Sequence, residues 1–402
     1  MSHIIFHIDV NSAYLSWTAV EQLKNGADVD IRTIPAIIGG DRESRHGIVL
    51  AKSPSAKKFG IRTGEPVVNA FRKCPNLHMD PPNHRMYREY SRRLMDFLKT
   101  YTPEIEQVSV DECYMDFTGI AQRFSSPVEA AYEIKARVYE KFGFTVNVGI
   151  STNKLLAKMA SDFEKPNRVH TLFQEEVKEK MWPLPVSELF MAGKSSVAIL
   201  EKLEIRTIGE LAKTDPKLLE FHLKSHGRTL WEFANGIGDA KVQSEETAAK
   251  GVGNSTTLPK DVEKAEDAKK VLFSLAESVG KRLRKAGQKA NMVSVEIRYS
   301  DFQNVSHQKQ LGRASGADQV IYEAACSLFD ELWNGKPIRL LGVRTAKLVD
   351  EDEPEQLSLF DLQFEVKSEK PKKSMEKLKK LSAAMGEIRG KYGADAVIRG
   401  SV

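Results

Sequence analysis

Three acidic side chains in two short motifs are the residues of this chain most able to do chemistry. Asp9 follows the mostly apolar run 4–8, and the neighbours Asp111 and Glu112 interrupt the strand-like stretch 108–116. Burying such carboxylates close together is costly unless cations neutralise them, and oxygen-only ligands suit Mg²⁺ or Mn²⁺. Two such ions about 4 Å apart commonly catalyse phosphoryl or nucleotidyl transfer. The spacing alone leaves two interpretations open, a metal site and a set of surface acids at strand ends.

The predicted elements around these motifs can bring the acids together. Short apolar runs predict strands, and a 3.6-residue repeat predicts helices. In chain order we predict a strand at 3–9, an amphipathic helix at 84–101, two short strands within 105–117, a helix at 127–142, a strand at 144–150 and a helix at 153–163. Because neighbouring strand residues point to opposite faces, Asp111 and Glu112 can share a site only if the chain turns there, at a hairpin tip. This order matches a ferredoxin-like split βαβ sheet with about 65 residues inserted after the first strand.

The insertion and the second half of the chain predict further units. A helix is expected at 12–25, and short strands followed by a helix at 54–59 are expected within 33–61. Residues 175–238 are mostly helical with short links, and 239–257 have the composition of an extended polar linker. Beyond it we predict helices at 264–286 and 317–333 and strands at 291–299, 305–311 and 338–348. The whole pattern is that of a multidomain α+β protein.

Length and composition exclude several protein classes. Of the 402 residues, 41% are hydrophobic, which is ample for packed cores. This length predicts about two to four domains. No apolar run approaches the about 20 residues that span a bilayer, and residues 1–3 do not begin a secretory signal. Three cysteines, at positions 74, 113 and 326, are too few and too far apart for a disulfide framework or a zinc site. We therefore expect a cytoplasmic protein without a membrane anchor.

The net charge of +5 is distributed unevenly. Residues 240–348 hold 18 Lys and Arg against 13 Asp and Glu, residues 349–365 hold seven acids and no base, and residues 366–402 carry a net +6. Basic patches attract phosphate backbones, although a charge run is often only a solvated face. This alternation of charge suggests that the basic module, the acidic connector and the basic tail have different functions in the protein.

Five collinear motifs make the chain resemble the Y-family DNA polymerases, the translesion enzymes that include bacterial polymerase IV. The resemblance covers residues 3–362, and the matching segments are Ile8–Tyr14, Ala56–Ile61, Ser109–Asp116, Gly149–Asp162 and Lys165–Asn167. It implies a right-hand polymerase with a ferredoxin-like palm, small fingers, a helical thumb and an α/β little finger. The implied boundaries are 1–19 with 79–171 for the palm, 20–78 for the fingers, 172–240 for the helix-hairpin-helix-like thumb, 246–349 for the little finger, 350–362 for an acidic linker with a clamp-binding peptide, and 363–402 for a basic tail.

The resemblance also implies roles for individual residues at the catalytic site. Asp9, Asp111 and Glu112 match the family's catalytic carboxylates. Together with the carbonyl of Val10, they would hold two Mg²⁺ ions. Tyr14 lies at the family's steric-gate position, where a bulky ring would clash with a ribose 2′-hydroxyl and so select deoxynucleotides.

The residues expected to bind the triphosphate depart from the family pattern. Lys165 matches the family's phosphate-contacting lysine, where a mobile ammonium is a suitable point charge. In the fingers, the usual threonine, tyrosine and arginine are replaced by Ala51, Pro54 and Lys57. Lys57 keeps the charge but cannot form a bidentate fork, and Lys52 or Ser53 could compensate. These departures leave the polymerase IV and polymerase V branches as alternatives.

Outside the catalytic site, the resemblance implies contacts with primer–template DNA. The thumb loop keeps only the second glycine of the family pattern, Gly193, which Lys194 follows. In the little finger, Arg298, Arg313 and Arg344 are the expected phosphate contacts. Contacts of this kind position a duplex without reading its sequence.

A short apolar segment in the acidic linker resembles the bacterial clamp-binding peptide. Its matching residues are Gln356, Leu357, Leu359 and Phe360. Gln356 would hydrogen-bond to the sliding clamp, and the last two residues would fill an apolar groove. Exposed apolar residues in an acidic linker have no core of their own to join, which favours an anchoring role.

The leading hypothesis is a Mg²⁺-dependent, DNA-templated polymerase of low fidelity. It would add dNTPs to a primer, act as a monomer in damage bypass and be recruited by the sliding clamp. A catalytically inactive, clamp-bound scaffold of the same fold is an alternative that the altered triphosphate contacts leave open. A nucleotide cyclase is a third possibility, because a ferredoxin-like palm with paired acids also serves that chemistry.

Overall fold

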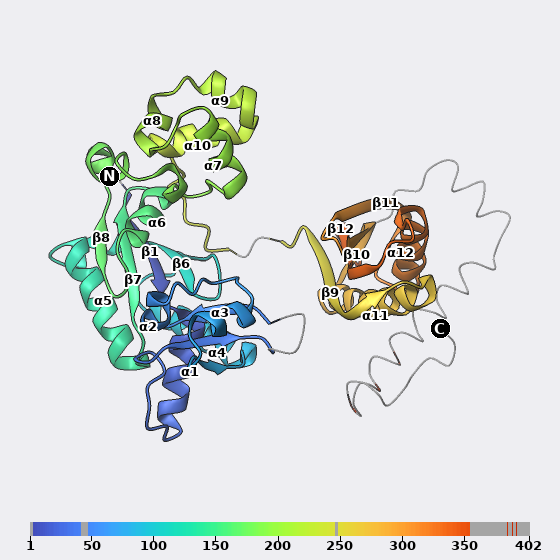
Figure 1. The fold of residues 1–402 in the computed structure, drawn as a ribbon. Helices are drawn as coiled ribbons and strands as arrows, with labels where there is room; N and C mark the ends of the chain where they lie inside the picture. Colours follow the sequence, from blue (N-terminus) through green and yellow to red (C-terminus); the bar gives the residue numbers. More distant parts are fainter. Residues whose placement is uncertain are drawn as a thin grey trace. The chain divides into compact units, whose positions relative to one another are not determined.

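The computed structural model of this chain describes residues 3–41, 47–245 and 248–353, together with the isolated helical positions 384, 388 and 391. The chain divides into two units, one formed by the described residues up to 245 and the other by those from 248 onward. Figure 1 shows the helices and strands of each. The expected clamp-binding peptide lies outside the described residues, as does nearly all of the basic tail. Among the helices that the structure describes, none is long and apolar enough to cross a membrane.

A five-stranded sheet in the first unit confirms the predicted ferredoxin-like order. Its strands are β1 (Ile5–Val10), β5 (Ile105–Gln107), β6 (Glu112–Asp116), β7 (Val146–Ser151) and β8 (Val169–Thr171). They lie in the order β5-β6-β1-β7-β8, with β1 antiparallel to both of its neighbours and β8 parallel to β7. The β5–β6 connection is the predicted hairpin, and Asp111 lies in its turn directly before β6.

Two long helices cover one face of this sheet, α4 (His84–Leu98) and α5 (Pro127–Phe142), and share an apolar cluster with it. The ends of α5 follow local signals. Ser126 caps its first turn with a side-chain oxygen, and Gly143 ends it with a φ of 78°. These signals explain why the predicted and observed limits of α5 coincide. α4 ends three residues before the predicted position 101, because the chain forms a turn there.

The opposite face of the sheet is covered by α6 (Lys154–Asp162), which brings charged residues onto it. Asn153 caps this helix by accepting a hydrogen bond from the Leu156 amide at 2.8 Å. Helix and sheet approach closely at Gly149, where an added Cβ would lie 2.0 Å from the carbonyl oxygen of Ala157. Because only glycine tolerates this approach, Gly149 fixes how closely the side chains of α6 lie over β1.

The residues inserted after β1 form helices and a three-stranded sheet. The helices are α1 (Ala13–Lys24), α2 (Pro54–Lys58) and α3 (Val67–Lys73), and the strands are β2 (Ala36–Gly39), β3 (Val49–Lys52) and β4 (His78–Asp80). The sheet has the order β3-β2-β4, and β4 pairs in parallel with β2. Neither α3 nor β4 was predicted. The boundary expected between residues 78 and 79 therefore falls inside a strand of this small sheet.

The next segment of the first unit is helical, as predicted for 175–238. Its α-helices are α7 (Lys194–Lys202), α8 (Ile208–Lys213), α9 (Pro216–Leu223) and α10 (Ser225–Ala234). They share one apolar cluster with α6, so this segment packs onto the helix layer of the sheet. Residues 239–245 then lie alongside β5, where the Gln243 amide donates to the Glu106 carboxylate at 2.8 Å.

The second unit is a four-stranded antiparallel sheet with two helices on one face (Figure 1). Its elements are β9 (Gly251–Val262), α11 (Ala265–Lys285), β10 (Gln288–Tyr299), β11 (Asn304–Ser315), α12 (Asp318–Leu332) and β12 (Ile338–Asp350), with the strand order β11-β10-β12-β9. The predicted linker at 239–257 was wrong over residues 251–257, where β9 begins. This edge strand is rich in small and polar residues because its outer face does not pack against a helix, so its alternation is weak.

Candidate active site and nucleic-acid interface

A pocket of about 590 Å³ lies between the five-stranded sheet and the β3–α2 segment, within the range of about 300–1,000 Å³ typical of ligand sites. Its lining includes Asp9, Val10, Tyr14, Lys52, Ser53, Lys57, Asp111 and Lys165. Of the residues predicted for catalysis and nucleotide binding, only Glu112 is not part of this lining. The structure thus brings together residues that are up to 156 positions apart, as for Asp9 and Lys165.

Strand pairing sets Asp9 and Glu112 side by side. The two residues are directly opposite in the antiparallel β1–β6 ladder, so their side chains leave the same face of the sheet, the one that α6 covers. Asp111 is held separately in the turn, where the Ser109 hydroxyl donates to its carboxylate at 2.6 Å. The backbone also joins the two motifs, because the Val10 amide donates to the Asp111 carbonyl at 3.0 Å.

Lysines from α6 and the loop after it neutralise two of these acids. Lys158 is only 9% exposed, and its ammonium lies 3.2 Å from Glu112 and 3.4 Å from Asp162. Lys165 forms an ion pair with Asp9 and lies 2.9 Å from Asp162. A buried carboxylate is tolerated only with such a partner, and Asp9 is 6% exposed. The site therefore carries its own counter-charges.

His7, which is fully buried, lies next to Glu112. Its Nδ1 is 2.8 Å from the Ser161 hydroxyl, which donates its own hydrogen to the Lys158 carbonyl, so the ring hydrogen of His7 lies on Nδ1. Its Nε2 is 3.6 Å from Glu112, too far for a hydrogen bond, and has no hydrogen-bond partner among the described residues. Burial lowers the pKa of His7, so the ring is neutral at pH 7.

The pKa values of the acids reflect these surroundings. Although His7 is the nearest ring to Glu112, its Nε2 carries no hydrogen to donate, so the Lys158 ammonium is the group that holds the pKa of Glu112 below its ordinary value. Burial raises the pKa of Asp9, and Lys165 limits that rise. Burial also opposes the charge of Lys165, but Asp9 outweighs it and the pKa of this lysine is raised.

The residue types at the pocket suit a divalent metal, although the lysines engage two of the carboxylates. Asp9, Asp111 and the Val10 carbonyl are the hard oxygen donors that Mg²⁺ prefers. Within residues 3–41, 47–245 and 248–353, no group of three or more His, Cys, Asp or Glu side chains is arranged to hold an ion. Glu112 would complete the donor set only by turning away from Lys158.

Tyr14 has a rigid aromatic support at the pocket wall. Its ring stacks on Tyr87 with centroids 4.3 Å apart and planes at 8°, and it meets the edge of His84 at 5.9 Å. Tyr87 is buried, and its hydroxyl lies 3.0 Å from the Thr18 hydroxyl. The orientation of Tyr14 therefore depends on α4 as well as on its own helix.

Two asparagines hold the loop that carries Lys165. The Asn11 side chain accepts a hydrogen bond from the Asn167 amide at 2.8 Å and donates to Asn147 at 3.0 Å. Asn147 in turn donates to the Glu164 carbonyl at 2.7 Å. These bonds anchor both ends of the loop, so Lys165 is kept beside the end of β1.

The β3–α2 segment carries the residues at which this chain departs from the expected pattern. Ala51 is buried in a small apolar cluster with α1, and Pro54 begins α2. Ser53 is fully buried, and its hydroxyl is bonded within the fold. Lys57 is exposed and lines the pocket. Of the predicted triphosphate contacts in this segment, Lys57 is accessible and Ser53 is not.

The predicted DNA-contacting loop in the helical segment directly precedes α7. Gly193 occupies the N-cap position without a side-chain cap, and an added Cβ there would meet no atom within 4 Å. Gly193 and Lys194 are both exposed. The first amides of this helix are therefore open to an anion, which the helix dipole favours.

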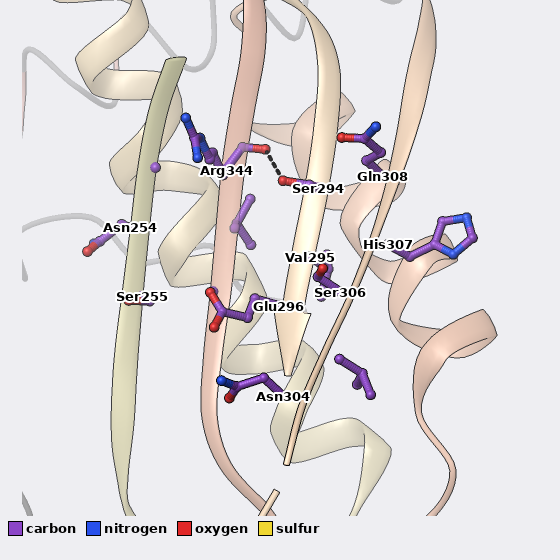
Figure 2. Close-up of a pocket in the computed structure, with 14 residues that line it drawn as sticks. Asn254, Ser255, Ser294, Val295, Glu296, Asn304, Ser306, His307, Gln308 and Arg344 are labelled. Atoms are coloured by element: carbon purple, nitrogen blue, oxygen red, sulfur yellow. Dashed lines mark hydrogen bonds between the residues drawn. The ribbon is translucent and has the colours of Figure 1, made fainter. Parts of the chain in front are cut away.

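A hollow of about 870 Å³ lies on the sheet face of the second unit that is opposite the helices (Figure 2). Arg344 lines it, and the Ser294 hydroxyl donates to the Arg344 carbonyl at 3.3 Å. Arg298 lies four residues further along β10 than Ser294, on the same side of the strand, and donates to Asn304 at 2.7 Å. Arg313 lies near the end of β11, is partly buried and does not line the hollow. Two of the three predicted arginines therefore belong to this face.

Comparisons with known proteins agree over the whole chain. A model of the impB/mucB/samB family matches residues 8–162, and the model of that family's C-terminal domain matches residues 249–359. DNA polymerase IV of Clostridium acetobutylicum is 48% identical over 99% of this chain and 98% of its own length. DNA polymerase IV 1 of Bacillus subtilis is 37% identical over 100% of this chain and 93% of its own. This chain belongs to the Y-family DNA polymerases.

The fold agrees with this family as well. The Y-family DNA polymerase chimera Dbh-Dpo4(243-245)-Dbh superposes with a TM-score of 0.75, covering 86% of this chain and 99% of its own, at 23% identity. The predicted right-hand α+β architecture is therefore confirmed. The relatives reported above are named DNA polymerase IV, so over nearly its whole length this chain is similar to members of that branch.

Sequence reasoning missed two residues of this Y-family site. Lys158 and His7 surround Glu112, yet neither was predicted to have a role. A signal was present for Lys158, because it lies on the apolar side of α6 between buried residues and four positions before Asp162. A lysine on the buried side of an amphipathic helix needs a partner. His7 offered no such signal beyond its place in an apolar strand.

Proposed function

We propose that this chain, a Y-family DNA-directed DNA polymerase, extends primers across damaged templates by two-metal catalysis at the pocket of Asp9 and Asp111. The observation that carries the proposal is the pocket itself, because it combines carboxylates, a stacked tyrosine and lysines from segments far apart in sequence. Neither a scaffold nor a simple DNA-binding module needs that combination. Primer–template DNA and dNTPs would be the substrates.

In this proposal Asp9, Asp111, Glu112 and the Val10 carbonyl hold two Mg²⁺ ions. Such ions would activate the primer 3′-hydroxyl and stabilise the charge that develops on the leaving pyrophosphate. The chain's own residues orient the nucleotide. Tyr14 would exclude a 2′-hydroxyl, and Lys165 would exchange part of its pairing with Asp9 for the triphosphate.

The family's domain names are assigned to this chain as part of the same proposal. The palm would comprise 1–19 and 79–171, the fingers 20–78, the thumb 172–240 and the little finger 246–349. Gly193, Lys194, Arg298, Arg313 and Arg344 would contact the DNA backbone. The enzyme would act as a monomer in the cytoplasm, and Gln356, Leu357, Leu359 and Phe360 would bind the sliding clamp.

Primer extension by the purified chain alone tests the catalytic part. With Mg²⁺ and four dNTPs on a primed template, we expect short, distributive products that disappear in Asp111→Ala. Absence of products from the unmodified chain, with or without the clamp, would instead favour the inactive scaffold. Cyclic nucleotide formed without a template would favour the cyclase.

Recruitment is tested separately on the full-length chain. The double variant Leu359→Ala with Phe360→Ala should lose stimulation by the sliding clamp and keep its basal extension. Equal stimulation of the variant and the unmodified chain would remove the clamp-binding assignment and leave the polymerase assignment intact.

A further inference from the structure

Lys52 is an ammonium at the pocket wall that has no role in the proposal above. It is the last residue of β3, where side chains alternate between two sides of the strand. The preceding Ala51 is buried in the apolar cluster with α1, so Lys52 points to the opposite side. Lys52 lines the pocket together with Lys57 and Thr63.

The neighbouring hydroxyl of Ser53 cannot serve a ligand in its place. Ser53 is fully buried, and its oxygen accepts hydrogen bonds from the amides of Ala36 at 3.1 Å and Ala56 at 3.0 Å. Its single hydrogen is donated to the Ile34 carbonyl at 2.7 Å. With two acceptor sites and one donor in use, the hydroxyl has no capacity left. Ser53 therefore ties α2 to β2 and does not face a nucleotide.

The charge of Lys52 is not neutralised by an ion pair within the described part of the chain. Its ammonium donates to the Thr63 hydroxyl at 3.2 Å. Glu65, an acid in its surroundings, accepts instead from Lys73 at 2.6 Å and from the Arg62 amide at 2.8 Å. Burial and the neighbouring charge of Lys57 lower the pKa of Lys52.

Lys165, by contrast, is neutralised in this structure by Asp9 and Asp162. The pocket thus has one lysine already paired with carboxylates, and two further lysines, Lys52 and Lys57, in its lining. The charge of Lys57 opposes that of Lys52, and Lys52 is partly removed from water. An anion that can contact both ammonium groups would therefore be favoured.

We infer that Lys52, held by Thr63, binds the terminal phosphates of the incoming nucleotide together with Lys57. This assignment rests on the proposed polymerase function and extends it. Lys52 and Lys57 would together make the phosphate contacts that the family's usual tyrosine and arginine make in this segment, although Lys52 stands at a different position from either. Ammonium groups act as point charges without a fixed fork, so recognition depends on phosphate charge more than on phosphate geometry. The site should therefore favour triphosphates over diphosphates.

Nucleotide binding without chemistry tests this inference. The full-length chain is bound to a template with a dideoxy-terminated primer in Mg²⁺, and the affinities for the complementary dNTP and dNDP are measured. For Lys52→Gln we expect the dNTP affinity to fall about tenfold, as for one charge-assisted contact, and the dNDP affinity to fall much less. Lys52→Arg should restore most of the dNTP affinity. Lys58→Gln is the matched control, because it removes the same charge from α2 at a residue that does not line the pocket.

Steady-state kinetics provide a second measurement. In extension by Lys52→Gln, KM for the dNTP should rise while kcat changes little, because the contact is present before and during the reaction. An unchanged dNTP affinity in Lys52→Gln would overturn the inference, and so would an equal loss for dNTP and dNDP. If the unmodified chain binds no dNTP and extends no primer, the proposed function itself fails. These outcomes separate failure of the Lys52 assignment from failure of the polymerase assignment.

Discussion

Two hollows of the molecule, one in each unit, differ in what surrounds them. The pocket of about 590 Å³ in the first unit is lined by charged groups, and its acids Asp9 and Asp111 are bonded within the fold. The hollow of about 870 Å³ in the second unit is lined mainly by small and polar residues, and only Arg344 and Glu296 among them carry a full charge (Figure 2). Charges held in fixed pairs suit chemistry on a small ligand, whereas an open polar surface suits a large one.

The second hollow exists because side chains are small where strands lie side by side. Gly342 lies between Ser255 and Glu296 across the sheet, and an added Cβ would be 3.1 Å from the Ser255 Cβ. Gly253 likewise faces Arg344, with a Cβ distance of 3.1 Å. The hollow of the second unit therefore depends on glycines that lack side chains, whereas the pocket of the first unit depends on ion pairs between its side chains. Mutations in the two regions should consequently affect different steps.

The largest expected effect comes from removing a carboxylate in the pocket. In Asp9→Asn, primer extension should fall by about 10³-fold or more, because Asp9 is a metal ligand in the proposed mechanism and its loss would remove several kcal/mol of transition-state stabilisation. Affinity for primer–template DNA, measured by fluorescence anisotropy, should stay the same. The matched control is Asp116→Asn on β6, outside the pocket lining. A parallel loss of DNA binding in Asp9→Asn would contradict the division between the two regions.

The next effect concerns the stability that the Lys158–Glu112 pair provides. The Lys158 ammonium holds the pKa of Glu112 below its ordinary value of 4.5. This carboxylate therefore stabilises the fold fully above about pH 4.5, and the contribution is lost as the pH falls through the lowered pKa. Lys158→Met should cost about 1–3 kcal/mol of unfolding free energy at pH 7. The difference from the unmodified chain should shrink below about pH 4.5.

Chemical denaturation of both proteins across this pH range measures the Lys158 effect. Lys99→Met, a change at an exposed lysine just after α4, is the control and should show no such pH dependence. A stability difference that stays constant between pH 7 and 3 would mean that Lys158 acts through packing and not through its charge.

The surroundings of Glu112 illustrate which features of the structure the sequence could predict and which it could not. The limits of α5 and the strand order were predictable, because caps, periodicity and connection lengths are local signals. The Asp9–Glu112 proximity followed from the hairpin and the sheet order. The pairing of Glu112 with Lys158 was not predictable, because it depends on how closely α6 approaches the sheet at Gly149. That approach is a matter of tertiary packing.

In the β3–α2 segment, too, the local structure was predictable but the partners of a polar side chain were not. Its helix was predicted from Pro54 and Gly60, but Ser53 was expected to bind nucleotide. Its hydroxyl is instead bonded to backbone groups of Ile34, just before β2, and of Ala36, the first residue of β2, which lie 19 and 17 positions earlier in the chain. Motifs identify the residues near a ligand, whereas the partners that occupy each polar atom come from non-local contacts.

A third effect is expected at the aromatic wall of the pocket. Tyr14→Ala should lower discrimination against ribonucleotides by at least about tenfold, because a steric difference of this size is worth about 1–3 kcal/mol. Tyr87→Leu, which removes the stacked support 4.3 Å behind Tyr14, should lower it less. Single-nucleotide incorporation of paired dNTPs and rNTPs measures both ratios. Unchanged discrimination in Tyr14→Ala would refute the steric-gate assignment. An effect of Tyr87→Leu as large as that of Tyr14→Ala would mean that the orientation of the Tyr14 ring depends wholly on the stacked Tyr87 ring.

A smaller effect is expected on the open face of the second unit. Arg344→Gln should weaken DNA binding by about 1 kcal/mol and reduce the slope of log affinity against log salt by about 1, as for one phosphate contact. The rate of incorporation at saturating DNA should not change. Lys270→Gln, on the helix side of the unit, removes the same charge and should leave the salt slope as it is. A full salt slope in Arg344→Gln would exclude a phosphate contact there.

The smallest effect should come from Glu296, the acid in the same hollow. If this face binds phosphates as proposed, the Glu296 carboxylate repels the DNA backbone, so Glu296→Gln should raise DNA affinity by less than about 1 kcal/mol and leave the rate of incorporation unchanged. Glu331→Gln on α12 is the matched control on the helix side. The same change from carboxylate to amide that abolishes chemistry at Asp9 would then slightly favour binding here. If Glu296→Gln weakened binding instead, Glu296 would be accepting a hydrogen bond from a base, and the open face would read sequence as well as shape.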